Sequence, residues 1–151
     1  DDPAIFSAGE RYEGFKEAMA AAGLAIRPEW VVMGRHHPDR WEQLVGALCA
    51  VQPRPTALFT AQNFITICAL RALHSLGLQH EIAMVGFDDV ELADVVEPAV
   101  SVVPQQPLEL GRRAGQMLFD RLDGSTAGQS KEVIASPIIV RGSGEIRPPA
   151  G

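Results

Sequence analysis

Residues 82–90 read Ile82-Ala83-Met84-Val85-Gly86-Phe87-Asp88-Asp89-Val90, an apolar run that ends abruptly at two carboxylates. A run of this kind is typical of a buried parallel strand whose carboxyl end opens into a crevice. Open α/β sheets bind their ligands at that edge. The sequence therefore predicts that Asp88 contacts a ligand.

The segments on either side of this run alternate between helical and strand-like patterns. Ser7, with Glu10 three residues later, forms a capping box, which predicts a helix that begins there and ends at Gly23. Alternating strands and helices indicate βαβ units, and therefore an α/β fold with a mostly parallel sheet flanked by helices. Further helices are expected within 38–48, 64–76 and 107–122, strands at 30–33, 56–60, 82–87, 100–103, 132–135 and 138–140, and a frayed Gly/Pro-rich tail from residue 142.

Three polar side chains are expected at the edge of the sheet where the strands end. Gln62 follows the strand at 56–60 and Asp88 follows the next strand, while Arg11 lies in the first turn of a helix that points to the same edge. Arg11 is either a solvated side chain paired with Glu10 or a guanidinium aimed at a ligand. A fork of donors, an amide and an acceptor-only carboxylate together suit a polyhydroxylated or polar small molecule.

Motifs that carry catalysis are missing from the sequence, which has no Walker-type loop, no G-x-S-x-G elbow and no H-E-x-x-H. Asp89 beside Asp88 is a general acid or base, a solvated residue, or a cap of the next turn. A phosphoacceptor role for Asp88 would need a strand-end lysine, and neither Lys16 nor Lys131 has that place. His36-His37 has no further ligands at metal spacing. We therefore expect no enzyme, no metal and no cofactor.

Composition narrows the class of protein. The 151 residues are 46% hydrophobic and 21% charged, with a formal charge of −6. A negatively charged surface repels phosphate backbones, so this piece alone should not bind nucleic acid. No apolar run approaches the length of a membrane span. Cys49 and Cys68 lie in apolar helical stretches, which predicts buried thiols in a reducing compartment. The chain opens Asp1-Asp2-Pro3 without Met or a signal peptide, so we expect a fragment or a processed chain.

The helix expected at 64–76 is apolar nearly all round. Ile67 and Leu70 are among the apolar residues that extend beyond a single stripe. One face can cover the sheet, but the other must also be buried. Either a subunit interface or deep burial within a larger domain would account for this.

Short motifs follow one another along almost the whole chain. They are Arg11-Tyr12-Glu13-Gly14-Phe15, the segment 55–63, Ala69-Leu70-Arg71-Ala72-Leu73 with Gly77-Leu78, Val85-Gly86-Phe87-Asp88-Asp89, Leu110-Gly111-Arg112-Arg113-Ala114 and Val140-Arg141-Gly142-Ser143. In order and spacing they resemble the motifs of the lac repressor/galactose repressor (LacI/GalR) family.

The resemblance implies a bacterial transcriptional repressor with an N-terminal helix-turn-helix and a two-lobed effector-binding domain of periplasmic-binding-protein type (type I). This chain is similar to the C-terminal part of that domain. Residues 1–103 and 132–142 correspond to the C-terminal lobe, 104–124 to a crossover and a helix of the absent N-terminal lobe, and 143–151 to a tail. The first strand of the C-terminal lobe also falls before the match, and the orphaned helix 107–122 should be displaced, disordered or buried against another copy.

The resemblance also implies which residues make contacts. A small-molecule effector, such as a sugar, would be bound by Arg11, Gln62, Asp88 and Gln105, with His36 near a further contact. The chain departs from the family pattern at two places. Gln62-Asn63 replaces the family's Asn-Asp, and Gln106 stands where the family usually has Pro. A homodimer would form through Ile67, Leu70, Arg71 and Val95. Operator DNA would be bound only by the absent head, in a cytoplasmic protein without membrane contact. The alternative is a periplasmic sugar-binding protein of an uptake system, which the scarcity of lysine disfavours.

Overall fold

The computed structural model describes residues 5–34, 37–124, 128 and 131–148. The expected helices at 64–76 and 107–122 and strands at 56–60, 82–87 and 100–103 form within a residue or two of the predicted bounds. The elements in chain order are α1 (Phe6–Ala21), a 3-10 turn (Pro28–Trp30), a second (Pro38–Arg40), α2 (Trp41–Ala50), β1 (Ala57–Thr60), α3 (Asn63–Leu76), β2 (Ala83–Phe87), β3 (Ser101–Val103), α4 (Pro107–Leu122) and a third 3-10 turn (Ser143–Glu145).

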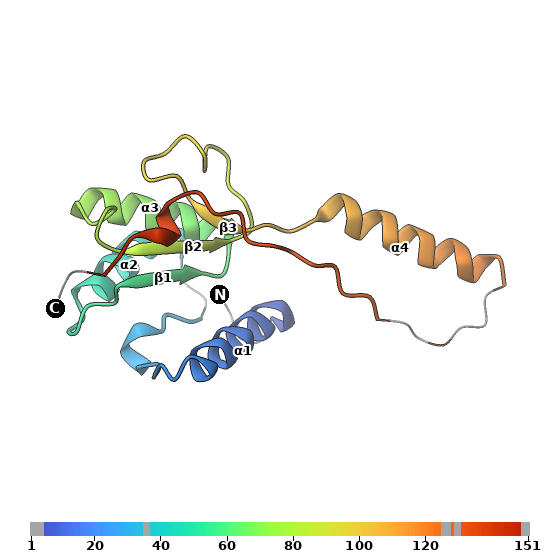
Figure 1. Cartoon of the computed structure of the whole chain (residues 1–151), viewed down its shortest axis with the longest axis horizontal. Coiled ribbons are helices and arrows are strands. Elements are labelled where there is room, and N and C mark those ends of the chain that lie inside the picture. The colour runs from blue at the N-terminus through green and yellow to red at the C-terminus, as the bar shows by residue number, and fades with distance from the viewer. Residues whose placement is uncertain (1–4, 35–36, 125–127, 129–130, 149–151) are drawn as a thin grey trace.

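The three strands form one parallel sheet in the order β1-β2-β3. Thr60 pairs with Gly86 and Phe87 with Val103, so the carboxyl ends of all three strands meet at one edge. Figure 1 shows α2 and α3 on one side of β1 and α1 on the other. The expected α/β architecture with a parallel sheet flanked by helices is therefore confirmed.

The core lies between the sheet and the helices α2 and α3. Its largest fully buried apolar side chains are Leu73, Ile82, Met84, Val100 and Val102. Burial of each contributes about 1.5–3 kcal/mol relative to exposure. This core fixes β2 in the middle of the sheet, and so fixes the place where β2 ends.

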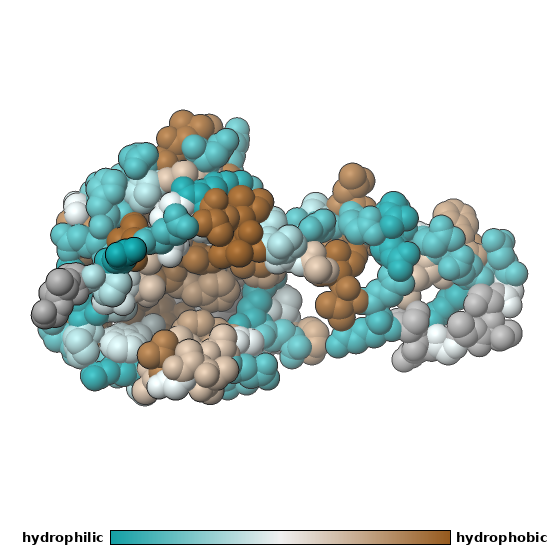
Figure 2. All heavy atoms as spheres, in the orientation of Figure 1, coloured by the Kyte–Doolittle hydropathy of each residue, from teal (hydrophilic) through white to brown (hydrophobic). Residues whose placement is uncertain are grey.

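Helix α4 projects away from this body (Figure 1), and none of its residues is buried. The segment 131–140 returns beside it, joined by a bidentate ion pair between Arg113 and Glu132 at 2.7 and 2.6 Å. Hydrophobic side chains of this arm are open to solvent (Figure 2), among them Phe119 at 62% and Val133 at 84% exposure. Within the described residues, α4 therefore covers no sheet.

Two predictions for the first part of the chain are wrong, namely the cap of the first helix and the strand at 30–33. Ser7 is the second residue of α1, and the cap position belongs to Ile5, which makes no side-chain capping bond. The segment 30–33 is not a strand, because a strand needs a neighbour to pair with. Residues 30–33 and β1 line an apolar pocket of about 130 Å³. The indole N–H of Trp30 donates to the Pro53 carbonyl at 3.1 Å.

The closing segments also differ from prediction. Strands do not form at 132–135 or 138–140. The β-pairing of these described residues is limited to an isolated antiparallel bridge between Val102 and Ile139. In contrast, the tail is not frayed at its start. Ser143 is 2% exposed, and its Oγ donates to the Met84 carbonyl at 2.6 Å.

Both cysteines, Cys49 and Cys68, are free and buried, as predicted. Burial raises the pKa of each thiol above its ordinary value. Within the described ranges, no helix combines the length and apolar character that a membrane crossing requires.

Candidate functional site

The site is built on the residue at which β2 ends. Asp88 continues the ladder, because its N–H donates to the Val103 carbonyl at 2.8 Å. Its φ of 71° then turns the chain into the left-handed region, which Asp tolerates better than most residues. The Asp88 carboxylate accepts the next N–H, that of Asp89, through Oδ1 at 3.1 Å. The local fold thus holds this carboxylate at the edge of the sheet where the parallel strands end.

Gln105 meets Asp88 from the neighbouring strand. It follows β3 by two residues and donates its side-chain amide to Asp88 Oδ2 at 3.2 Å. A carboxylate has about four acceptor positions, and the described side-chain and backbone donors occupy two of them. Acceptor capacity therefore remains for the hydroxyl or amine hydrogens of a ligand.

Arg11 reaches the same edge from α1. Its Nη1 donates to the Ala61 carbonyl at 2.9 Å, and its guanidinium carbon lies 4.0 Å from the centre of the Phe87 ring. Burial lowers the pKa of Arg11, while the nearby negative charge of Asp88 raises it. The guanidinium is thus aimed at the strand ends rather than paired with Glu10, and a guanidinium has further donors for a ligand.

Gln62 lies beside this cluster without joining it. It occupies the cap position before α3 in an extended conformation, and its side chain is exposed. Its carbonyl accepts hydrogen bonds from the N–H and the hydroxyl of Thr66 at 2.9 and 3.0 Å. The structure therefore brings together Arg11, Asp88 and Gln105, with Gln62 next to the Ala61 carbonyl that binds Arg11.

Arg141 is a site residue that sequence reasoning did not single out. It binds Asp89 in a bidentate ion pair, with both N–O distances at 2.7 Å. The hydrogen bond from Arg141 lowers the pKa of Asp89, and Asp89 Oδ1 also accepts the Val90 N–H at 3.0 Å. Asp89 therefore pairs with Arg141 and bonds to the N–H of the next residue, while its side chain remains 40% exposed. The pairing spans 52 residues, so no local pattern signals it.

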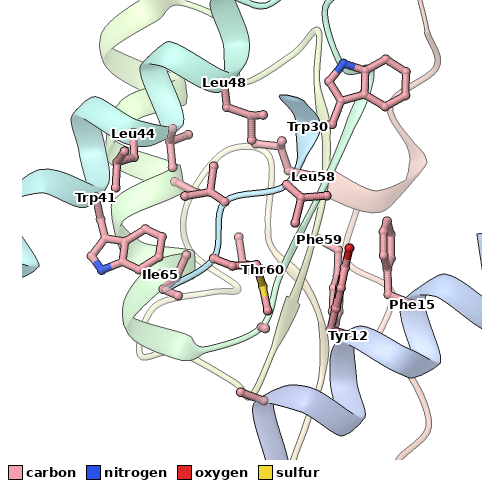
Figure 3. Close-up of a pocket in the computed structure, with 17 residues that line it drawn as sticks. Tyr12, Phe15, Trp30, Trp41, Leu44, Leu48, Leu58, Phe59, Thr60 and Ile65 are labelled. Carbon is pink, nitrogen blue, oxygen red and sulfur yellow. The ribbon is translucent and has the colours of Figure 1, made fainter. Parts of the chain in front are cut away.

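The apolar pocket beside β1 has a different chemistry from this polar cluster. Figure 3 shows aromatic and aliphatic side chains from α1, α2 and β1 around it. The rings of Phe15 and Phe59 stack with their centres 6.1 Å apart. A hydroxyl-rich ligand finds few partners there, which favours the edge at Asp88 as its site.

The residues predicted for the subunit interface are only partly exposed to solvent. Val95 is 71% exposed and Ile67 38%. Arg71 is exposed and pairs with Glu42 at 3.4 Å, while Leu70 packs against the core. His36 lies outside the described residues, and within those residues no three metal-binding side chains gather.

Comparisons with known proteins agree with this architecture. The profile of the periplasmic binding protein-like domain matches residues 4–144. The HTH-type transcriptional repressor PurR of Haemophilus influenzae (strain PittEE) is 32% identical over 142 residues, covering 91% of this chain and 42% of the repressor.

Two solved structures extend the comparison. The transcriptional regulator CelR in complex with cellobiose is 31% identical with a TM-score of 0.76, covering 89% of this chain and 42% of its own. A regulatory protein of the LacI family from Chloroflexus aggregans is 29% identical with a TM-score of 0.70, covering 77% of this chain and 43% of its own. The chain thus spans about two-fifths of the length of the curated relatives it matches.

Proposed function

This chain belongs to the periplasmic binding protein-like family as it occurs in LacI-type repressors, and on that premise we propose that it senses a small-molecule effector, such as a sugar, for a DNA-binding transcriptional regulator. The observation that carries the proposal is the meeting of Arg11, Asp88 and Gln105 at the carboxyl edge of a parallel sheet. The relatives compared above are transcriptional regulators, so an uptake protein is not favoured.

In this proposal, residues 1–103 and 132–142 are one lobe of a two-lobed domain. Residues 104–124 cross to the other lobe, and α4 covers a sheet there, which accounts for its exposed apolar side chains. Residues 143–151 form a tail whose start is fastened to the sheet. The effector lies between the lobes and shifts their relative position, and coupling of this kind is typically about 1–3 kcal/mol.

Each polar residue has a distinct role in binding. Asp88 accepts hydrogen bonds from ligand hydroxyls, Gln105 holds that carboxylate in place, and Arg11 donates from α1. Gln62 contributes through its exposed amide. The set of roles fits a polar, uncharged ligand, because the positive charge of Arg11 and the negative charge of Asp88 offset each other.

We also infer that the protein acts as a homodimer in the cytoplasm. The interface would use Ile67, Leu70, Arg71 and Val95, and the exposure of Val95 and Ile67 supports this. Operator DNA would be bound by a separate head, since the net charge of −6 on this chain opposes contact with DNA.

The proposal is tested on the full-length regulator by a thermal-shift screen with cellobiose, ribose and hypoxanthine as probes, followed by calorimetry. Asp88→Ala should weaken binding about ten- to a hundredfold, because a hydrogen bond to a charged group is worth about 1.5–3 kcal/mol. Asp123→Ala, at an exposed residue that ends α4, is the control and should bind as the wild type does. Equal affinity of Asp88→Ala and the wild type would refute the assignment.

A further inference from the structure

We propose that Arg141 is a positioning residue that sets the orientation of the Asp88 carboxylate through Asp89, and so ties the effector site to the segment that returns from α4. The inference rests on the proposed function for its meaning, because Asp88 matters here as the ligand acceptor. Its geometry, however, stands on contacts that are independent of any ligand.

The ion pair between Arg141 and Asp89 differs from the bidentate pair between Arg113 and Glu132 in the surroundings of its guanidinium. Both guanidinium–carboxylate bonds measure 2.7 Å, and Arg141 Nη1 donates a third bond to the Val100 carbonyl at 3.2 Å. The Arg141 side chain is 18% exposed, whereas that of Arg113 in its bidentate pair with Glu132 is 42% exposed. The Arg141 guanidinium is thus held by three hydrogen bonds and is more shielded from water than that of Arg113, while the Asp89 carboxylate remains 40% exposed.

Asp89 passes this restraint to the turn that carries Asp88. The N–H of Asp89 is bonded to Asp88 Oδ1, and the N–H of Val90 is bonded to Asp89 Oδ1. The orientation of the peptide plane between Asp88 and Asp89 therefore sets where the Asp88 carboxylate lies. Because Asp88 has a φ of 71°, the turn is one that a non-glycine residue keeps only when its surroundings hold it.

Arg141 is itself fastened to the sheet through its backbone. Its N–H donates to Ser101 Oγ at 3.0 Å, and the Gly144 N–H donates to the same oxygen at 3.2 Å. Two residues earlier, Ile139 forms the bridge with Val102 at the end of the returning segment. A movement of α4 relative to the sheet would therefore reach Asp88 through a short series of hydrogen bonds, and this series is a physical route for effector coupling.

The test uses NMR on the whole 15N-labelled 151-residue chain. In Arg141→Gln, hydrogen exchange at the Asp89 and Val90 amides should rise about tenfold or more, and the Gln105 side-chain amide should shift upfield as its bond to Asp88 weakens. Arg113→Gln, which breaks an ion pair of the same bidentate geometry on the arm, should leave these signals unchanged. Asp89→Asn should reproduce the effect, and the double variant should add nothing to it.

Two results would overturn the inference: unchanged Gln105 signals in Arg141→Gln, or effects of Arg141→Gln and Asp89→Asn that simply add. On the full-length protein, Arg141→Gln should also weaken cellobiose binding about tenfold if cellobiose is bound. Failure of the wild type to bind cellobiose, ribose or hypoxanthine would count against the proposed function, whereas the NMR comparison decides the role of Arg141 in either case.

Discussion

Gly86 is the position in β2 where an added methyl group has the clearest consequence. It lies two residues before Asp88, at a place where α3 approaches the sheet closely. A Cβ at Gly86 would lie 2.8 Å from Thr66 Oγ1, 3.0 Å from Thr66 Cγ2 and 3.5 Å from Thr60 Oγ1. The two threonine hydroxyls share a buried hydrogen bond of 2.7 Å, so neither side chain is free to move aside.

The expected cost of Gly86→Ala follows from these contacts. Overpacking of a close-packed interior typically costs about 1–3 kcal/mol. Rotation of Thr66 to relieve the clash would also break its hydroxyl bond to Thr60 and leave a buried polar group unpaired, at about 1–3 kcal/mol. Gly86→Ala should therefore destabilise the chain by about 2–6 kcal/mol, a large share of the ~5–15 kcal/mol that stabilises a typical domain.

Urea unfolding of the 151-residue chain, followed by circular dichroism, measures this cost. Gly14→Ala serves as the matched control, because Gly14 lies within α1 with open space around it, and alanine should stabilise that helix by about 0.5–1 kcal/mol. Thr66→Ala removes both clashing atoms, so it should cost less in the Gly86→Ala background than in the wild type. A Gly86→Ala variant as stable as the wild type would refute the close-approach argument.

Other expectations follow from the same contacts. Arg141 holds the pKa of Asp89 below its ordinary 3.8, so the stability from this pair is present above that pH and is lost as the pH falls through the lowered pKa of the folded state. Asp89→Asn should therefore flatten the loss in melting temperature below about pH 4. Because burial raises the pKa of Cys49 and Cys68, iodoacetamide should alkylate both slowly in the native chain and quickly in urea, as followed by mass spectrometry. The 151-residue chain alone should bind effector far more weakly than the full-length protein in calorimetry, and comparable affinity would contradict the two-lobed assignment. If the full-length protein forms the proposed dimer, Val95→Glu should shift it toward monomer in analytical ultracentrifugation, whereas Leu24→Glu, also at an exposed apolar residue, should not.

Much of the fold was predictable because the strands β1, β2 and β3 are short apolar runs with clear ends. The segment 30–33 has the same pattern and yet is not a strand. The pattern reports only that Val31 and Val32 favour burial, whereas a strand also needs a neighbouring edge, and an apolar pocket separates these residues from β1. Pairing is a property of the surroundings, which a single segment does not encode.

The candidate site was predictable to a similar degree. Asp88 and Arg11 were placed by the rule that parallel strands end at one edge, and the structure brings them together with Gln105. The ion pair of Arg141 could not be predicted, because its partner Asp89 lies 52 residues away in the sequence. The hydrogen bond from the Ser143 hydroxyl to the Met84 carbonyl could not be predicted for the same reason. The Gly/Pro-rich composition of the tail predicts only fraying.

The topology explains why the proposed effector site lies close to the segments that lead to and from α4. In a parallel sheet every strand ends at the same edge, so a chain that leaves the sheet after β3 leaves it at the ligand-binding edge. Gln105 therefore both bonds to the Asp88 carboxylate and belongs to the segment that leads from β3 to α4. The chain returns beside β3 at Ile139 and binds Asp89 through Arg141 two residues later. The segment that leaves the sheet and the segment that returns to it thus both contact the turn that holds Asp88, and under the proposed function a ligand bound there would act on both segments.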